Sequence, residues 1–280
     1  MPSVSWGIES QGTTSAIRTV GVVTVATNRY LDYWREMAAT ADEHLFPGHE
    51  VVMHVFTDRV DEALAMAGGF SRIRVNAIEV EALGWPDATL LRYSLIDRHA
   101  EHLQQDLLVH LDADMQVVAD VGPELDPAHW PGGIALVRHP GYWRPHWPQR
   151  SALYMKKPRM AARDAVSMVQ HGSVGMWERH QASRAFVPRS RRRTYVCGGT
   201  WMGLREPFCA MVHELATRTD ADTQDQIMAI WHDESHLNWY ASHHRTAFLG
   251  TEYCYALGFP NLAGMQARIV AVDKGDDRTR

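Results

Sequence analysis

The sequence predicts an α/β fold in which the strands of a sheet alternate with crossover helices. Two observations carry this prediction: short β-branched and apolar runs recur along the chain, and the segments between them place apolar residues at helical spacing. The chain of 280 residues is 45% apolar and 22% charged, and no Pro/Gly/Ser-rich linker or long charged block divides it. We therefore expect a single domain with a sizeable core.

The expected elements follow in chain order. TVGVVTVAT has the β-branched composition of a buried strand, and RYLDYWREMAATADEHLF repeats apolar residues with the period of an amphipathic helix. EVVMHVFTD and SRIRVNAIEV resemble strands in composition, and LLRYSLIDRHAEHL resembles a helix that leads into the strand of DLLVHLDADMQVV. The strands are thus predicted at 19–27, 50–58, 71–80 and from 106, and the helices at 29–46 and 90–103.

Composition excludes several classes of protein. The formal net charge of -5 argues against a surface built to bind nucleic acid. No apolar run is long enough for a transmembrane segment, and the first residues lack the basic-then-apolar order of a secretion signal, so the cytoplasm is the expected compartment. Cys197, Cys209 and Cys254 match neither a disulfide framework nor a CxxC metal motif, and we expect reduced thiols.

Asp112 and Asp114 end an apolar strand, at the edge where an open α/β sheet binds its ligands. Two acids at i and i+2 of an extended segment point to the same side, so both carboxylates can face one hard cation such as Mg²⁺ or Mn²⁺. A metal held in this way suits an enzyme that binds a nucleotide diphosphate and neutralises it as it departs. The alternative is a plain strand end, with Asp112 as a cap and Asp114 in a solvated turn.

A second polar cluster, WHDESHLNWY at residues 231–240, lies on a predicted helix. His232 and His236 stand at i and i+4 and could share a zinc ion, which would indicate a zinc hydrolase. The H-E-x-x-H pattern of zinc proteases needs a glutamate directly after the first histidine, whereas Asp233 occupies that place and Glu234 follows it. Alternatively, the two acids only favour the dipole at the start of a polar helix.

The segment TYVCGGTWMG, residues 194–203, combines adjacent glycines with aromatic residues. Gly198 and Gly199 let the backbone approach a ligand closely, and Tyr195 or Trp201 could lie against the apolar face of a sugar. A tight turn in a β-ribbon explains the glycines equally well. Just before them, the arginine-rich run at residues 189–193 fits a solvated loop, although clustered arginines also suit phosphate.

Six segments, taken in order, resemble glycosyltransferase family 6, the family of the ABO blood-group glycosyltransferases and the α1,3-galactosyltransferases. They are FTD (56–58), LDADM (111–115), RHPGYW (138–143), WER with AFVP (177–188), YVCGGTWMG (195–203) and WHDESHLN (231–238). The resemblance runs from about residue 25 to residue 274, nearly the whole chain, and HDESHLN is its most specific part.

The resemblance implies a GT-A fold, with a Rossmann-like nucleotide-sugar-binding sheet and a C-terminal acceptor-binding part. Within the single domain of residues 1–280, residues 19–120 would bind the nucleotide sugar, 121–265 the acceptor, and 266–280 would form a mobile tail. The implied reaction is a retaining transfer of N-acetylgalactosamine or galactose from a UDP-sugar to a β-galactoside, with or without fucose, in α1,3 linkage. Mn²⁺, or alternatively Mg²⁺, would be held by Asp112 and Asp114.

The donor-binding residues also follow from the resemblance. Val25 and Thr27 would lie beside the uracil and Tyr30 would stack on it. Glycine at the third place of the triplet CGG resembles the blood-group enzymes that use UDP-N-acetylgalactosamine, so we expect that donor to be preferred. The full implied donor set is Val25, Thr27, Tyr30, Arg92, Asp112, Ala113, Asp114, Cys197, Gly198, Gly199, Asp233, Lys274 and Arg280, the last two in the tail that closes over the diphosphate.

Glu234 matches the family's catalytic glutamate on the β face of the donor sugar. A retaining enzyme needs there either a nucleophile or a group that stabilises oxocarbenium charge. His139 and Trp231, together with Glu234, would contact the acceptor galactose. Ala256 stands where the blood-group enzymes carry an aspartate that helps to hold the acceptor, so the acceptor's identity is left open.

Two further expectations concern the kind of family member. The chain lacks the membrane anchor and stem of the animal enzymes and therefore resembles a soluble microbial-type member. A sugar-binding protein that kept the fold and lost catalysis is the alternative from a non-enzyme class. The presence of Asp112, Asp114 and Glu234 argues against that alternative.

Overall fold

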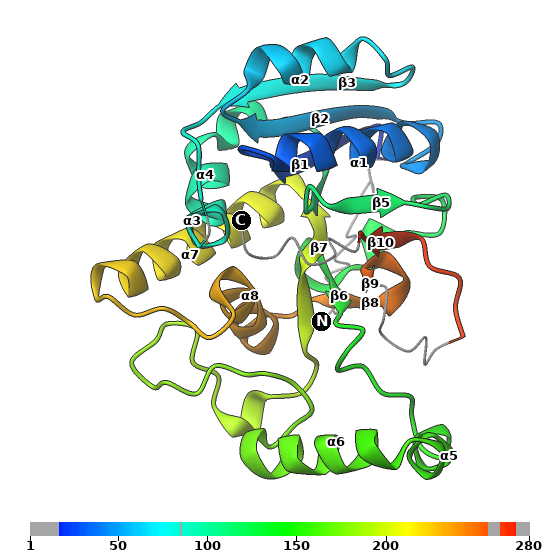
Figure 1. The fold of residues 1–280 in the computed structure, drawn as a ribbon, viewed down its shortest axis with the longest axis vertical. Helices are drawn as coiled ribbons and strands as arrows, with labels where there is room; N and C mark the ends of the chain where they lie inside the picture. The colour runs from blue at the N-terminus through cyan, green and yellow to red at the C-terminus, as the bar shows by residue number, and fades with distance from the viewer. Residues whose placement is uncertain (1–16, 85, 257–263, 273–280) are drawn as a thin grey trace, which may run out of the picture.

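A computed structural model describes the chain at residues 17–84, 86–256 and 264–272. Its main sheet has the strand order β3-β2-β1-β4-β7-β6-β8, and a small second sheet has the order β5-β10-β9 (Figure 1). The strands are β1 (Thr19–Val25), β2 (Glu50–Thr57), β3 (Ile73–Glu79), β4 (Leu107–Leu111), β5 (Met115–Val117), β6 (Ile134–Arg138), β7 (Val196–Leu204), β8 (Ala247–Leu249), β9 (Tyr255–Ala256) and β10 (Ile269–Ala271). The predicted α/β fold is confirmed.

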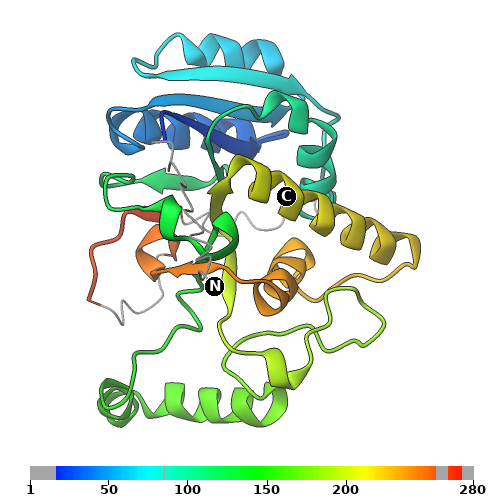
Figure 2. The same cartoon turned by 180° about the vertical axis from the view of Figure 1, so that it is seen from behind.

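The helices separate into a group that packs on the main sheet and a pair that lies apart from it. The helices are α1 (Tyr30–His44), α2 (Val60–Ala67), α3 (Asp87–Leu90), α4 (Arg92–Arg98), α5 (Gln149–Lys156), α6 (Pro158–His171), α7 (Arg205–Gln224) and α8 (His232–His243). Short 3₁₀ turns are η1 (Ala100–His102), η2 (Pro127–His129), η3 (Pro131–Gly133), η4 (Arg189–Arg191) and η5 (Thr251–Tyr253). In both views α5 and α6 lie at the end of the molecule opposite α2 and β3 (Figures 1 and 2).

The direction of the strands brings the polar segments to one edge of the main sheet. β1 pairs in parallel with β2 and with β4, and β2 pairs in parallel with β3. Because parallel strands end at the same edge, the C-terminal ends of β1 and β4 are neighbours there. β7 runs antiparallel between β4 and β6, so its first half reaches the same edge.

One face of the main sheet is covered by α1. The apolar residues predicted to form its buried stripe are all buried, among them Leu31, Trp34 and Met37. They pack on side chains from alternate positions of β4, Leu107 and Val109, as the two-residue period of a strand requires. The helical periodicity of the sequence therefore identified this layer.

The opposite face is covered by α4, α7 and α8, which lie beside β7 (Figures 1 and 2). The intervening positions of β4 and β7 point this way, so Leu108 and Trp201 pack with Phe208 of α7 and Leu237 of α8. Burial of these large side chains removes apolar surface from water at roughly 25 cal/mol per Å². α8 is thus fixed against the strand that carries the paired glycines.

Two predicted elements differ from the structure. The helix expected at 90–103 is broken: α3 ends at Leu90, α4 spans Arg92–Arg98, and the 3₁₀ turn η1 then directs Leu103 into the core. The acidic pair was expected on an extended segment, but β4 ends at Leu111 and the chain turns before β5 pairs with β10 in the second sheet. None of the helices in the described part of the chain is long and apolar enough to cross a bilayer.

Candidate active site

A cleft of about 410 Å³ opens where β4, β7 and the start of α8 meet. It brings together residues from five parts of the chain that the sequence separates widely. Its lining is formed by Thr89, Arg92, Asp112, His139, Tyr142, Gly198, Gly199, Trp231, His232, Asp233 and Glu234. Eight of the residues predicted for the site are in this set: Arg92, Asp112, His139, Gly198, Gly199, Trp231, Asp233 and Glu234.

Asp112 and Asp114 lie on a tight turn at the end of β4. The turn is closed by a hydrogen bond from Met115 N to Asp112 O (3.2 Å), and Asp112 N donates to Gly199 O (3.0 Å). The second bond continues the pairing of β4 with β7, so the acidic turn and the glycine pair are held against each other. Both carboxylates are partly exposed, while Ala113 between them is buried.

Arg92, the first residue of α4, lies between two carboxylates. Its Nη2 is 2.7 Å from Asp112 Oδ1, and its Nη1 donates to Asp233 Oδ2 (2.6 Å). Burial alone would lower the pKa of this guanidinium, but Asp112 and Asp233 together raise it above its usual value. Arg92 is therefore cationic and joins the end of β4 to the start of α8.

His110 lies beneath the acidic turn and was not singled out from the sequence. It is 0% exposed, stacks on Trp201 with ring centroids 4.7 Å apart, and places Nε2 at 3.3 Å from Asp112 Oδ1. Burial, and after it Arg92, lowers the pKa of His110 to about 4, so the ring is neutral at pH 7. Since a carboxylate only accepts, Nε2 carries the proton and donates to Asp112.

Asn238 docks α8 onto the start of β7. Its Oδ1 accepts from Val196 N and its Nδ2 donates to Val196 O, both at 2.9 Å. Residues four apart lie on the same face of a helix, so this clamp also directs Glu234 toward β7. The sequence showed Asn238 only as one polar residue of a crowded helix, because its partner is a backbone group 42 positions away.

Glu234 is held by two donors that approach from the same strand. Tyr195 Oη donates to Glu234 Oε1 (2.9 Å), and Gly198 N donates to Glu234 Oε2 (2.9 Å). A Cβ added at Gly198 would stand 3.4 Å from the Cβ of Glu234, an ordinary contact distance, so helix and strand are closely packed here. Tyr195, expected to lie against a sugar, is instead buried and orients the carboxylate.

The two acids at the start of α8 have raised pKa values. Burial raises the pKa of Glu234 to about 7, although the hydrogen bonds from Gly198 and Tyr195 oppose this shift. Burial also raises the pKa of Asp233 to about 6, against the opposing effect of Arg92. Shifted carboxyl groups in a cleft are typical of catalytic sites.

The cleft is also lined by aromatic residues, His139, Tyr142 and Trp231. His139 accepts through Nδ1 from Gly141 N (3.0 Å), and its ring lies 4.7 Å from that of Tyr142. Burial lowers the pKa of His139 to about 4, so its Nε2–H is a neutral donor at pH 7. Trp231 is 47% exposed at the rim of the cleft. An exposed indole beside a polar floor suits the apolar face of a sugar ring.

The remaining predicted donor residues, Asp114 included, are not among those that line the cleft, and two of them lie outside the described part of the chain. Val25, Thr27 and Tyr30 are at the C-terminal end of β1 and the start of α1, where Thr27 Oγ1 donates to Leu83 O (3.0 Å). Cys197 is buried in β7 with Sγ 3.5 Å from Val137 O. Lys274 and Arg280 lie outside the described residues.

Other expectations from the same segments are corrected by burial. Trp201 cannot contact a sugar, because it is fully buried between His110 and Phe208. His232 lines the cleft near Thr89, whereas His236 is buried with Nε2 3.5 Å from Asp222, so the two rings do not face a common ion. The structure thus gives no support to the zinc hydrolase alternative.

The arginine-rich run before β7 is not a uniformly solvated loop. Arg189, Arg191 and Arg193 are exposed, but Arg192 is buried. The Arg192 guanidinium donates to three carbonyl oxygens, those of Val187 (2.7 Å), His171 (2.9 Å) and Glu178 (3.4 Å). This side chain therefore organises the loop that leads into Tyr195.

Comparison with known proteins agrees with the resemblance carried by these segments. The model of glycosyltransferase family 6 matches residues 8–146 and 156–280. The chain belongs to glycosyltransferase family 6. Its mainly parallel sheet, with the acidic turn at the end of β4, has the GT-A type of fold expected for this family. A protein of this family is a glycosyltransferase, which excludes the zinc hydrolase.

Relatives within family 6 are similar over most of the chain. Histo-blood group ABO system transferase 1 of Rattus norvegicus is 29% identical over 273 residues, 94% of this chain and 68% of the relative. Globoside alpha-1,3-N-acetylgalactosaminyltransferase 1 of Homo sapiens is 26% identical over 242 residues, 85% of this chain and 61% of the relative. Alpha-1,3-galactosyltransferase 2 of Homo sapiens is 26% identical over 242 residues, 85% of this chain and 63% of the relative.

Replacement of Tyr195 by Phe tests the electrostatics of this family 6 site. The Tyr195 hydroxyl stabilises the Glu234 carboxylate and lowers its pKa, whereas burial raises that pKa to about 7. We expect the pKa of Glu234 to rise further in Tyr195→Phe, as followed by NMR of isotope-labelled glutamate side chains. Tyr154→Phe is the matched control, because Tyr154 Oη donates to Asp164 Oδ2 (2.9 Å) away from the cleft. An equal effect of both variants would contradict this assignment.

Proposed function

We propose that this family 6 member is a retaining, metal-dependent enzyme that transfers N-acetylgalactosamine, in preference to galactose, from its UDP-sugar to a β-galactoside in α1,3 linkage. The observation that carries the proposal is the arrangement of Glu234, with both carboxylate oxygens held by Tyr195 and Gly198 in a cleft that Asp112 also lines. Relatives that are named α1,3-N-acetylgalactosaminyltransferase and α1,3-galactosyltransferase support the linkage and the sugar class.

Asp112 and Asp114 fit a divalent cation by their chemistry. They supply hard carboxylate oxygens on one turn, as Mn²⁺ and Mg²⁺ prefer. Arg92 and His110 both engage Oδ1 of Asp112, while Oδ2 lies on the side of Gly199, 3.1 Å from where its Cβ would be. A bound Mn²⁺ would neutralise charge on the UDP leaving group. Ala113 is proposed to meet the ribose, and Val25, Thr27 and Tyr30 the uracil.

Glu234 is proposed as the catalytic group on the β face of the donor sugar. In its ionised form the carboxylate acts as a nucleophile or stabilises oxocarbenium charge as UDP departs, and either role yields retention. Asp233, the preceding residue, is proposed to bind hydroxyl groups of the donor sugar, and Arg92 to contact the donor near the acidic turn. Because Tyr195 and Gly198 orient both oxygens of Glu234 before any substrate binds, little reorganisation is needed during the reaction.

The acceptor is proposed to bind against His139 and Trp231, which line the same cleft. The neutral Nε2–H of His139 would donate to a hydroxyl of the galactose, and Trp231 would cover its apolar face. Ala256 offers no carboxylate to the acceptor, so a difference in acceptor from the blood-group enzymes is expected. Residues 19–120 are proposed as the donor half, 121–265 as the acceptor half, and Lys274 and Arg280 as diphosphate contacts in the tail.

A catalytically inactive sugar-binding protein is the second hypothesis for this fold. The acidic turn and the two hydrogen bonds that orient Glu234 argue against it, because a carboxyl group with a raised pKa in a cleft is typical of a catalytic site. Release of UDP from UDP-N-acetylgalactosamine, measured with and without a β-galactoside acceptor, separates the two hypotheses.

Glu234→Gln tests the catalytic assignment. A glutamine oxygen can accept from Gly198 N while its amide donates to Tyr195 Oη, so the local structure and donor affinity should persist. We expect kcat to fall by about 10²-fold or more, the scale of removing one aligned electrostatic group. Glu214→Gln on α7 is the control, because Glu214 pairs with His244 and does not line the cleft. An unchanged kcat in Glu234→Gln would refute the assigned role.

Asp114→Asn tests the metal site. Loss of one anionic ligand should weaken Mn²⁺ binding at least about tenfold, since changes outside the first shell already act on this scale. Mn²⁺ affinity is measured by electron paramagnetic resonance and compared with the Mn²⁺ dependence of turnover. Asp126→Asn, an exposed aspartate whose side chain contacts His129, should change neither. Full activity in excess EDTA would rule out a required metal.

Gly199→Ala tests the donor preference. A Cβ at this position would stand 2.7 Å from Met115 Cε and 3.1 Å from Asp112 Oδ2, so the methyl group has room only if these neighbours move. We expect the ratio of kcat/KM values to shift toward UDP-galactose by about 10-fold, the effect of one methyl group in a close-packed site. Gly68→Ala, whose added Cβ would meet only Ala65 O at 3.5 Å, is the control. A native preference for UDP-galactose would overturn the proposal.

A further inference from the structure

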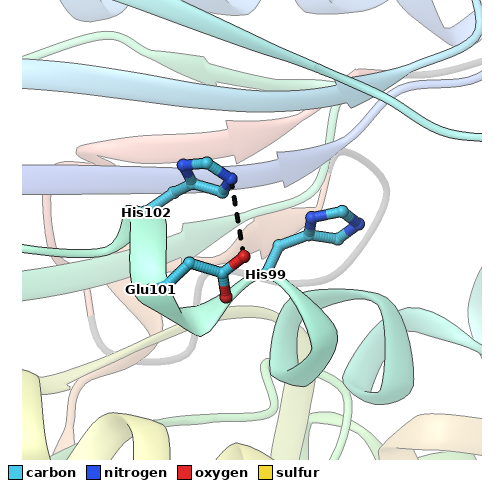
Figure 3. A group of neighbouring side chains, drawn as sticks. All are labelled: His99, Glu101 and His102. Carbon is cyan, nitrogen blue, oxygen red and sulfur yellow. Dashed lines mark ion pairs between the residues drawn. The ribbon is translucent and has the colours of Figure 1, made fainter.

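Three side chains of the kind that bind zinc stand together outside the cleft, at the turn between α4 and β4. They are His99, Glu101 and His102 (Figure 3). One ring nitrogen from each histidine and one carboxylate oxygen lie within 4.8 Å of one another, the one group of three or more such ligands found among the described residues. This H-x-E-H segment has no role in the proposed reaction and lies outside the motifs shared with family 6.

The backbone of η1 directs both histidines to the same side. His102 N donates to His99 O (3.0 Å), and Leu103 N donates to Ala100 O (3.0 Å). In a 3₁₀ turn residues i and i+3 eclipse one another, so the rings of His99 and His102 lie one over the other, with centroids 6.0 Å apart and an interplanar angle of 25°. The buried side chain of Leu103 anchors the end of the turn.

The surroundings leave these three groups facing one another. Glu101 Oε1 is 3.7 Å from His102 Nε2, and the His99 ring packs on Phe56 with centroids 5.6 Å apart. Arg98, next to the cluster, donates through Nε back to Ser94 O and so is directed along α4. The nearby His54 is buried, with its ring nitrogens bonded to Gln105 and Asn76, and does not join the group.

We propose that His99, Glu101 and His102 form a zinc-binding site. Zinc takes imidazole nitrogen and carboxylate oxygen at about 2.0–2.2 Å, which puts tetrahedral ligand atoms roughly 3.4 Å apart. Small side-chain rotations of the exposed Glu101 and His102 close the present spacing to that value. Water completes the fourth position. Imidazole ligands favour zinc over Mn²⁺, whereas the all-carboxylate pair Asp112 and Asp114 favours Mn²⁺ or Mg²⁺.

An ion at this site would connect the end of α4 to the segment that enters β4. Arg92 begins α4 and Asp112 follows the last residue of β4, so the proposed ion lies at the opposite end of each of these two elements. Zinc binding should therefore stabilise the native state through mass action, and it involves no residue of the cleft.

Calorimetric titration of the full chain, free of any affinity tag, with zinc tests the proposal. Mg²⁺ is kept in excess to occupy carboxylate sites. We expect one zinc ion to bind, a rise in Tm, and visible absorption typical of tetrahedral Co²⁺ when Co²⁺ replaces zinc. His99→Gln and His102→Gln should each weaken zinc binding tenfold or more and remove the rise in Tm.

The control is His129→Gln, since His129 is an exposed histidine paired with Asp126 at the same i, i+3 spacing. It should leave zinc affinity unchanged, as should Asp114→Asn. His102 is exposed, so His102→Gln keeps the fold even if His99→Gln does not. Absence of zinc binding at micromolar concentration, or equal affinity in His102→Gln and the unmodified chain, would overturn the proposal. Both outcomes are independent of transferase activity.

Discussion

The buried ion bridge of Arg92 is the constraint on which the rest of the site depends. Its guanidinium joins Asp112 at the end of β4 to Asp233 at the start of α8, and Arg92 itself begins α4. The charge of Asp112 raises the pKa of Asp233, and the guanidinium between the two carboxylates opposes this effect. Removing the guanidinium would leave the carboxylate of Asp233 buried without its cationic partner, which is strongly destabilising. Three elements therefore have a fixed mutual position.

The position of Glu234 follows from that frame and from the clamp of Asn238 on Val196. α8 cannot rotate about its axis without breaking the two hydrogen bonds of Asn238, and Glu234 lies one helical turn before it. Burial favours the protonated form of Glu234, while Tyr195 and Gly198 favour the carboxylate, and the balance leaves its pKa at about 7. A small change in the field around the site, such as a bound cation, shifts this balance toward the charged form.

Much of the fold was predictable because local patterns determine it. The period of Leu31, Trp34 and Met37 identified α1 and its buried face, and the apolar run before Asp112 placed the acidic turn at the ligand-binding edge. The suggested contact of Trp201 with a sugar was wrong. The side chain points toward α7 and the core, and this direction depends on how β7 pairs with β4.

The support for the site was beyond the reach of sequence patterns. Three contacts support the site: His110 with Asp112, Tyr195 with Glu234, and Asn238 with Val196. Tertiary packing brings the two members of each pair together. A family resemblance identified the site residues by their positions in shared motifs. Such motifs do not show which other groups orient the side chains of these residues. Their roles in binding and transfer stay predictions.

The insertion of β7 between β4 and β6 also shapes how the chain can fold during its synthesis. β1, β2, β3 and β4 leave the ribosome first, whereas the partner on the open side of β4, residues 196–204, follows only after α5 and α6 have been made. Until then β4 presents an unpaired edge with buried-type residues such as Leu107 and Val109, a surface that favours association between nascent chains. Contacts of such long sequence separation also slow folding. A fragment that ends between β4 and β7 would leave this edge of β4 open to pairing with another chain.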